Sequence, residues 1–466
     1  MRVEAGAAAF VACAVLAVSG LTALPARAAG PGTPYDFDAS GSSDLVAGTP
    51  EAASASGSVT VLPGSTAGPA PTGRRTLTQD TGSVPGAVEP GDRFGAATAS
   101  GDLDGDGRPD LVVGSPGEND TSGNADRGSV TVLTGASGLT AGTSFTTGAH
   151  WGPPDSARLG TDVEVGGRRR RRPRRRDRPR PRYGRQRLLA RLAGQCHRHR
   201  PHPRGRLRPR GRHRWRRRRL RRRRLRRPGG DHRRHLRHRQ SLRVHGRPGR
   251  SHGGFGAHVP PGRSLDVGDI DKDGHDDLLG GQPIAADAGG RSGGQITIKR
   301  GHPWGLNHPG DTVTVHQDTD GIPGTAEAGD ALGASVVLRD VDGDGVLDVL
   351  AGLPGEDIGV AGTTRADAGS ALVLRLTTGL TVASAQALDQ GADGIPGAAE
   401  PGDRFGAEVA AGDYTGASAV GLAVGAPGEN SGDGTVHVGA DGAAVFIGPA
   451  TAGTPAGGRL GAVLAP

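Results

Sequence analysis

The sequence predicts an all-β protein built as a β-propeller, and three observations lead to this fold class. Short apolar runs, often β-branched, are bounded by Gly, Pro and Asp, which is the punctuation of strands joined by tight turns. One unit containing such strands recurs at intervals of roughly 50 to 70 residues. No segment after any copy has the apolar period and length of an amphipathic helix. Several strands in each repeated unit are typical of propeller blades.

The first 28 residues have the pattern of an export signal. Arg2 supplies the positive charge, Ala7–Val18 is a short apolar run, and small residues precede the expected cleavage site before Ala29. The apolar run is too short for a typical membrane span. We therefore expect residues 1–28 to be removed and the mature chain to be secreted to the extracellular space, with no membrane span left after removal of the signal.

The cysteine content is typical of a chain without disulfides. The only cysteines are Cys13 and Cys196, and Cys13 lies within the predicted signal. The mature chain therefore cannot form an intramolecular disulfide, and a secreted protein of this kind depends on a large core or on bound metal for its stability.

Five copies of the repeated unit can be aligned. A complete copy begins with Phe-Gly or Leu-Gly, continues through a short alternating strand, an Asp-rich loop and an apolar strand, and ends at a Gly-x-Pro-like turn. The copies are Tyr35–Glu51, Asp92–Glu118, Phe255–Pro283, Ala331–Glu356 and Asp403–Glu429. A longer element, of the type QDTDGIPGTAEAGDALG, precedes three of them, at residues 79–95, 317–333 and 390–406.

These units resemble FG-GAP repeats, the blades of the seven-bladed β-propeller found in integrin α subunits and in many secreted bacterial proteins. The resemblance rests on Phe94-Gly95 and Phe405-Gly406, on the DxDxDG loops, and on the turn Gly425-Ala426-Pro427. It implies a ring of seven blades, Ca²⁺ bound structurally in loops between strands, and a binding or adhesion role. The C-terminal Arg459–Leu464 repeats the first strand of a unit, so we expect it to complete blade 1 and to lock the ring.

A basic segment interrupts this acidic protein. Of the 57 Lys and Arg residues, 39 are arginines between Gly167 and Gly254, where only two acidic residues oppose them. The remaining chain carries 18 basic residues against 46 of the 48 acidic ones. Translated as written, the segment has too few apolar residues to pack and would be disordered.

A shift of reading frame accounts for the arginines. A GC-rich coding sequence for GDVDGDGHDD, with one base inserted after its first codon, translates as GGRRRRRPRR, which is Gly166–Arg175. A sequence similar to this out-of-frame reading, GDIDKDGHDD, is encoded in frame at Gly268–Asp277. With a second shifted loop at residue 216, the unit loops start at residues 36, 102, 167, 216, 269, 340 and 413, which makes seven units. We hypothesise that residues 167–253 are a frameshifted reading of blades 3 and 4.

The predicted organisation has four parts. A signal peptide occupies residues 1–28, and blades 1, 2 and the start of blade 3 occupy 29–166. The Arg-rich low-complexity segment covers 167–253, and blades 5 to 7 with the closing strand cover 254–466. The alternative for the third part is a genuine basic segment that binds nucleic acid or other polyanions nonspecifically and in a salt-dependent way.

Three loops have the ligand pattern of Ca²⁺ sites, with Asp at positions 1, 3, 5 and 9 and Gly at position 6. Ca²⁺ takes six to eight oxygen ligands, which alternate carboxylates and the carbonyl of position 7 would supply. The predicted ligands are Asp102, Asp104, Asp106, Arg108 and Asp110; Asp269, Asp271, Asp273, His275 and Asp277; and Asp340, Asp342, Asp344, Val346 and Asp348. Asp36, Asp38, Ser40 and Asp44 form a partial fourth site. In the seventh copy Asp413 is followed by Thr415, Ala417 and Gly421, so we expect no metal there.

The sequence favours a non-catalytic function. Gly290–Gly294 matches G-x-S-x-G, but it precedes a predicted strand, whereas a nucleophile elbow leads from a strand into a helix. We predict no catalytic residues and a monomeric calcium-binding module for an extracellular protein or polysaccharide, without specific nucleic-acid binding. The alternatives are a secreted hydrolase built on the same propeller, and polyanion binding through the Arg-rich segment.

Overall fold

The computed structural model describes most of the chain on both sides of the Arg-rich segment. The described residues are 14–16, 33–120, 124–146, 158–166, 187–192, 263–287, 289–303, 306, 310–440 and 443–465. The predicted signal peptide apart from 14–16, and the segment 167–253 apart from 187–192, therefore lie outside the description. Within the described ranges the chain is nearly all β, as the sequence predicts.

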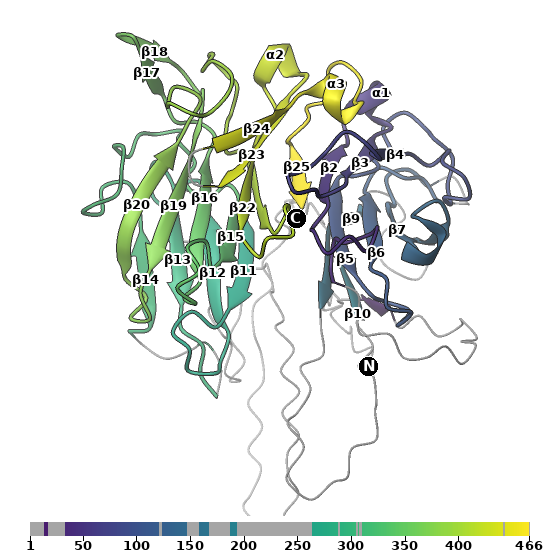
Figure 1. The fold of residues 1–466 in the computed structure, drawn as a ribbon, viewed down its shortest axis with the longest axis horizontal. Coiled ribbons are helices and arrows are strands. Elements are labelled where there is room, and N and C mark those ends of the chain that lie inside the picture. The colour runs from purple at the N-terminus through teal and green to yellow at the C-terminus, as the bar shows by residue number, and fades with distance from the viewer. Residues whose placement is uncertain are drawn as a thin grey trace, which may run out of the picture. The chain divides into compact units, whose positions relative to one another are not determined.

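Five four-stranded antiparallel sheets form the framework (Figure 1). We number them after the predicted units. Sheet 1 contains β25 (Val463–Ala465), β2 (Leu45–Thr49), β3 (Ser58–Leu62) and β4 (Arg75–Leu77), and sheet 2 contains β5 (Ala97–Gly101), β6 (Asp110–Ser115), β7 (Ser129–Leu133) and β8 (Gly142–Thr146). Sheet 5 contains β11 (Ser264–Gly268), β12 (Asp277–Gln282), β13 (Gln295–Lys299) and β14 (Thr312–Val315). Sheet 6 contains β15 (Val336–Arg339), β16 (Asp348–Leu353), β19 (Ser370–Leu376) and β20 (Val382–Leu388), and sheet 7 contains β21 (Glu408–Gly412), β22 (Gly421–Ala426), β23 (Thr435–Ala440) and β24 (Ala443–Ile447).

The smaller elements lie between or beside these sheets. Strand β9 (Leu159–Gly166) begins the third unit and pairs with β10 (Arg187–Leu192), which pairs in turn with β1 (Ala14–Leu16). Strands β17 (Ile358–Val360) and β18 (Thr363–Arg365) form a hairpin. The helices are single turns: α1 (Ala52–Ala55), α2 (Glu429–Gly432), α3 (Pro449–Ala452) and the 3-10 turn η1 (Gly135–Ser137).

Apolar side chains fill the spaces between neighbouring sheets. The second and third strands of a sheet are β-branched or leucine-rich and buried on both faces, as in β6 and β7, because another sheet covers each face. One cluster joins sheets 5 and 6 through Ile296, Ile298, Leu372 and Leu374. The core is therefore a series of layers between sheets, as in a propeller.

Neighbouring sheets meet through a repeated glycine contact, which explains the Phe-Gly signature. The glycine that follows the leading Phe or Leu has a positive φ and lies against a glycine in the second strand of the preceding sheet. A Cβ on that strand glycine would overlap the carbonyl oxygen of the leading glycine, well inside 3.0 Å. The pairs are Gly48 with Gly95, Gly114 with Gly160, Gly281 with Gly333, Gly352 with Gly406, and Gly425 with Gly461. The leading Phe or Leu is itself buried in each copy, so it fills the core while its glycine lets two backbones touch.

A glutamine–glutamate hydrogen bond also joins consecutive sheets, and it explains the longer sequence element. The glutamine follows the last strand of one sheet, and the glutamate follows the second strand of the next. Gln79 donates to Glu118, Gln317 Nε2 donates to Glu356 Oε2 at 2.7 Å, and Gln390 Nε2 donates to Glu429 Oε2 at 2.5 Å. Burial raises the pKa of both Glu118 and Glu356 to about 7.

The C-terminal strand belongs to the first sheet. Strand β25 pairs with β2 in the register Val46 with Ala465 and Gly48 with Val463, as the sequence predicts (Figure 1). The first strands of the sheets contact one another in the order β11, β15, β21, β25, β5 and β9. The path from β9 back to β11 runs through residues outside the described ranges, so closure into a seven-bladed ring stays a prediction.

Candidate metal centres

The three predicted loops occupy the same place in three sheets, between the first and second strands. Side-chain to backbone hydrogen bonds shape each loop, as in the turn after β5. Asp102 accepts from the backbone of Gly105 and of Gly107, at 2.7 and 3.2 Å, and both glycines have positive φ. Asp104 accepts from the backbone of Asp106 at 3.0 Å. The alternation of Asp and Gly thus folds the loop so that its carboxylates converge.

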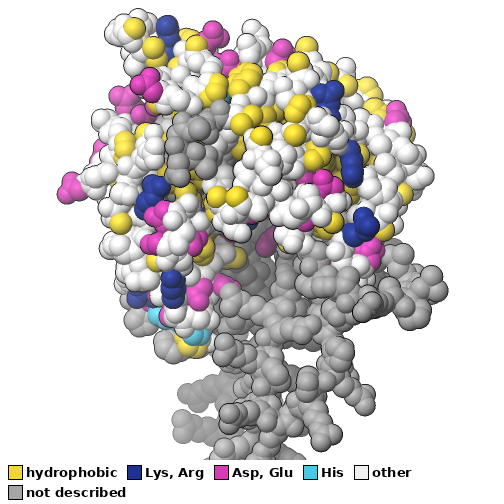
Figure 2. Space-filling view, viewed as in Figure 1, with side chains coloured by type: hydrophobic (Ala, Val, Ile, Leu, Met, Phe, Trp, Pro, Cys, Tyr) yellow, Lys and Arg dark blue, Asp and Glu magenta, His cyan; other side chains and the backbone are white. Residues whose placement is uncertain are grey.

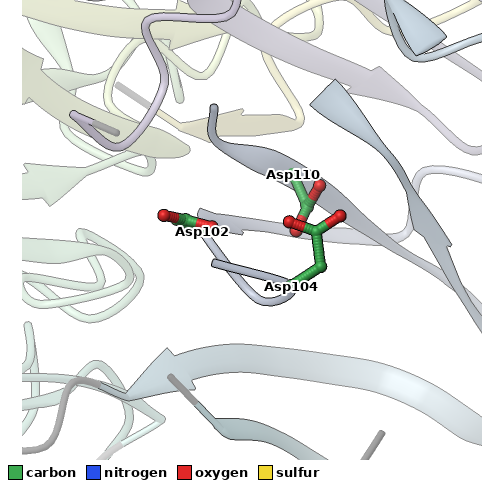
Figure 3. Close-up of side chains that lie close together, drawn as sticks. All are labelled: Asp102, Asp104 and Asp110. Carbon is green, nitrogen blue, oxygen red and sulfur yellow. The ribbon is translucent and has the colours of Figure 1, made fainter. Parts of the chain in front are cut away.

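Each loop brings three carboxylates together. One oxygen from every member of a group lies within 4.8 Å of the corresponding oxygens of the others. The groups are Asp102, Asp104 and Asp110; Asp269, Asp271 and Asp273; and Asp340, Asp342 and Asp344. In the first group, Figure 3 shows the carboxylates of Asp104 and Asp110 side by side, with Asp102 on the opposite side of the loop. Such a group of oxygen atoms can hold a hard cation.

Electrostatics within the first loop favour a cation. Burial raises the pKa of Asp104, and the neighbouring charges of Asp106 and Asp102 raise it further. In the other two loops an arginine partly balances position 3, since Arg300 pairs with Asp271 at 2.8 Å and Arg375 pairs with Asp342 at 3.2 Å. No such ion pair reaches Asp104 among the described residues. The first loop therefore has the least compensated negative charge.

The aspartate at position 9 has a structural role that the sequence did not predict. One of its carboxylate oxygens accepts the backbone N–H of loop position 2. The other oxygen accepts a backbone N–H at the end of the third strand of the sheet or just after it. Asp110 accepts from Leu103 at 2.8 Å and from Gly135 at 3.0 Å. Asp44, Asp277 and Asp348 repeat both contacts at 2.7 to 3.0 Å. Burial raises the pKa of Asp110 to about 6, and the two hydrogen bonds oppose that rise. Position 9 thus ties the loop to its sheet.

The remaining predicted ligands are placed less uniformly. Position 5 joins the carboxylate group in the second and third loops, as Asp273 and Asp344, whereas the first loop uses Asp110 in place of Asp106. Position 7 contributes a backbone N–H to the carboxylate of position 5, at 2.6 to 2.7 Å, and the residues concerned are Arg108, His275 and Val346. The sequence predicts that the carbonyl oxygen of position 7 faces the cation. The N–H contact does not place that oxygen, so this part of the ligand set stays a prediction.

The two imperfect loops do not form carboxylate groups within the described part of the chain. In the partial site, Asp36 and Asp38 share the single backbone N–H of Ser40, at 2.9 and 3.0 Å, and Asp44 is occupied by its two hydrogen bonds. In the seventh copy, Asp413 accepts the backbone N–H of Ser418 at 2.8 Å. Both are turns stabilised by side-chain hydrogen bonds.

Replacing Asp348 with alanine is expected to destabilise the protein even when no cation is bound. The side chain is 1 % exposed, and its loss leaves the N–H groups of Val341 and Leu376 without their acceptor. Two such losses cost about 2 to 4 kcal/mol. Urea unfolding in excess chelator measures the change, and Asp344→Ala, at an exposed position of the same loop, should cost less than about 1 kcal/mol there. Equal losses from the two variants would contradict the structural role of position 9.

Comparison with known protein families finds the FG-GAP repeat at residues 94–133 and 261–298. The first match spans β5 to β7 with the loop Asp102–Asp110, and the second contains β11, β12 and the loop Asp269–Asp277. A search of curated proteins finds no match to this chain. Within the described ranges, no helix has the length and apolar character needed to cross a membrane.

Proposed function

We propose that this chain, which contains two FG-GAP repeats, is a secreted calcium-binding β-propeller that serves as a non-catalytic binding or adhesion module. The observation that carries the proposal is the recurrence of one carboxylate group at the same place in three sheets. FG-GAP repeats are generally binding or structural modules, which supports the non-catalytic role.

The donor chemistry of the loops fits Ca²⁺. The groups contain only carboxylates, and oxygen ligands are those that Ca²⁺ and Mg²⁺ prefer. The acidic loops suit Ca²⁺, whose coordination geometry is variable, since Mg²⁺ requires near-ideal octahedral geometry and keeps several of its waters. The three groups of this chain would hold the ion, and the ion would neutralise carboxylates that the fold forces together. At about 10⁻³ M Ca²⁺ and a dissociation constant of about 10⁻⁴ M, each site would add about 1.4 kcal/mol of stability.

Thermal unfolding with and without chelator tests this proposal. We expect excess EGTA to lower the melting temperature of the full chain by several degrees, because the three sites together contribute about 4 kcal/mol. Restoring Ca²⁺, but not an equal concentration of Mg²⁺, should reverse the shift. The matched control carries Asp104→Asn, Asp271→Asn and Asp342→Asn, and its melting temperature should no longer respond to Ca²⁺. An identical response of the two proteins, or no response of either, would refute the metal sites.

The proposed binding partner is an extracellular protein or polysaccharide, and this protein is proposed to bind it as a monomer. The described face in Figure 2 carries acidic and basic side chains interspersed with polar and apolar ones, so no single sign of charge would steer the ligand to it. Secretion rests on the pattern in residues 1–28, which lie almost entirely outside the described ranges. An array of extracellular proteins and glycans, probed with and without Ca²⁺, would test this part. We expect a ligand whose binding requires the calcium-loaded fold.

A further inference from the structure

A cavity of about 410 Å³ lies between sheets 6 and 7. Strands β19 and β20 form one wall and β22 and β23 form the other, while the loops after β15 and β21 form part of its rim. Its apolar lining includes Val373, Leu388, Phe405, Leu422 and Val424. The size and the lining are typical of pockets that hold small organic molecules.

A glycine in β23 accounts for part of the space. Gly439 lies opposite Leu422 in the pairing of β23 with β22. The positions equivalent to Gly439 in three other sheets hold a leucine. These leucines are Leu62, Leu133 and Leu374, each 0 % exposed in the core between two sheets. At the junction of sheets 6 and 7 the leucine side chain is absent, so the equivalent volume is open. The seventh unit has also lost its acidic loop, and the small residues Ser418 and Ala419 of that loop border the cavity.

His437 lines the same cavity, and one of its ring nitrogens has no hydrogen-bond partner among the described residues. Its side chain is only 3 % exposed, and the equivalent positions hold Thr60, Thr131, Thr297 and Leu372. Nε2 lies 3.2 Å from Oγ1 of Thr435, whereas Nδ1 has no hydrogen-bond partner within the described part of the chain. The rings of Phe405 and Phe446 contact the imidazole edge to face, with centroids 5.2 and 5.5 Å away. A buried nitrogen without a partner is costly, so a group that pairs with it gains binding energy.

The charges around the cavity define what it can accept. Burial lowers the pKa of His437 to about 4, so the ring is neutral at pH 7 and carries one N–H and one lone pair. The only cationic side chain in the lining, Arg375, is paired with Asp342 at the rim. A ligand anion would therefore be buried without a counter-charge, which is strongly unfavourable, and the carboxylates of Asp340 and Asp342 at the rim would repel it. Once Ca²⁺ neutralises those carboxylates, a ligand cation would lack a counter-charge as well. A hydroxyl group can pair with Nδ1 whichever nitrogen holds the proton, because it both donates and accepts.

We propose that this cavity is a binding site for a neutral, mainly apolar alcohol or phenol that places its hydroxyl group against Nδ1 of His437. The cavity shares Asp340 and Asp342 of its rim with the third carboxylate group, whereas its interior is lined by apolar side chains and His437. It therefore goes beyond the calcium-binding role, and it is best tested at saturating Ca²⁺ so that the loop is in a single state. Failure of the calcium proposal would appear in the melting temperature and not in this measurement.

Titration of the full chain with 2-naphthol, followed by its fluorescence, tests the proposal. We expect saturable binding to one site, with naphthalene about tenfold weaker, because one hydrogen bond is worth about that factor. The charged analogue 2-naphthoate should bind at least tenfold more weakly than 2-naphthol. Failure of 2-naphthol to bind at concentrations up to about 1 mM, or equal binding of all three probes, would overturn the proposal.

Two variants locate the binding. Gly439→Leu should abolish binding of 2-naphthol and naphthalene alike while keeping the melting temperature at or above that of the parent, since leucine occupies this position in three sheets. His437→Phe should retain naphthalene binding and lose the preference for the hydroxyl group. If Gly439→Leu does not fold, the imidazole NMR signals of the parent decide. A His437 resonance that does not move during titration with 2-naphthol would equally overturn the assignment.

Discussion

Replacing Gly352 with alanine is expected to lower the free energy of unfolding by about 3 kcal/mol or more. The new methyl group would overlap the carbonyl oxygen of Gly406, which belongs to the backbone and cannot rotate away. Sheets 6 and 7 would have to separate along their whole contact, and overpacking of this kind typically costs 1 to 3 kcal/mol before any core contact is lost. Urea unfolding, with the midpoint and slope compared between variants, measures the effect.

The matched control for this variant is Gly359→Ala. Gly359 lies in the hairpin strand β17, and a Cβ built there meets no atom within 4 Å. Alanine is favoured over glycine by about 0.5 to 1 kcal/mol inside a strand, so this variant should be neutral or slightly more stable than the parent. If Gly352→Ala is tolerated as well as Gly359→Ala, the backbone contact between sheets is not what holds them in register.

Removing residues 459–466 is expected to unfold the protein or leave it without fixed tertiary structure. The segment supplies the first strand of sheet 1 and buries Leu460 and Leu464, which are 0 % and 7 % exposed. Burial of two leucines contributes about 3 to 6 kcal/mol, and the hydrogen bonds to β2 add several tenths to about 1 kcal/mol each. This sum is comparable to the whole stability of a typical domain. The truncation also removes the contact of Gly461 with Gly425, which joins sheet 7 to sheet 1.

Thermal melting and hydrogen exchange of the truncated chain check this expectation, and a synthetic peptide of residues 459–466 provides the control. Added in excess, the peptide should restore part of the melting transition, and a scrambled peptide should not. A truncated chain with the melting temperature of the parent would show that the strand adds nothing to the fold.

The sequence predicted the arrangement wherever the signal was local and repeated. The Phe-Gly starts, the Asp-rich loops and the apolar runs identify the strands and their order, because each is specified by a few neighbouring residues. The fragment Arg459–Leu464 was recognisable as a strand without its sheet, and the pairing of β25 with β2 agrees with that interpretation. The convergence of the loop carboxylates was also predictable, since alternation with glycine in so short a loop leaves few other arrangements.

The features that the sequence did not predict depend on contacts between distant residues. Asp348 resembles a ligand like any other until Leu376, which lies 28 positions later, is seen to donate to it. The touching glycines belong to different units, so the need for either glycine cannot be seen within its own unit. His437 and Gly439 were detectable in principle, because the aligned third strands hold Thr or Leu at the first position and Leu or Lys at the second. Only the packing of sheets 6 and 7 shows that together they border a cavity.

The pairing of β25 with β2 has a consequence for how the chain acquires its structure. Ribosomes release β2 early and β25 after all the other strands that the structure describes, so the first sheet is completed only after those strands have emerged. For that whole interval β2 presents an unpaired edge, which can capture a strand of another chain. Contacts between residues as far apart as 46 and 465 also form slowly, because closing so long a loop costs chain entropy before the strand contacts can stabilise it. We therefore expect the nascent chain to depend on chaperones that cover this edge, and refolding yield in vitro to fall as protein concentration rises.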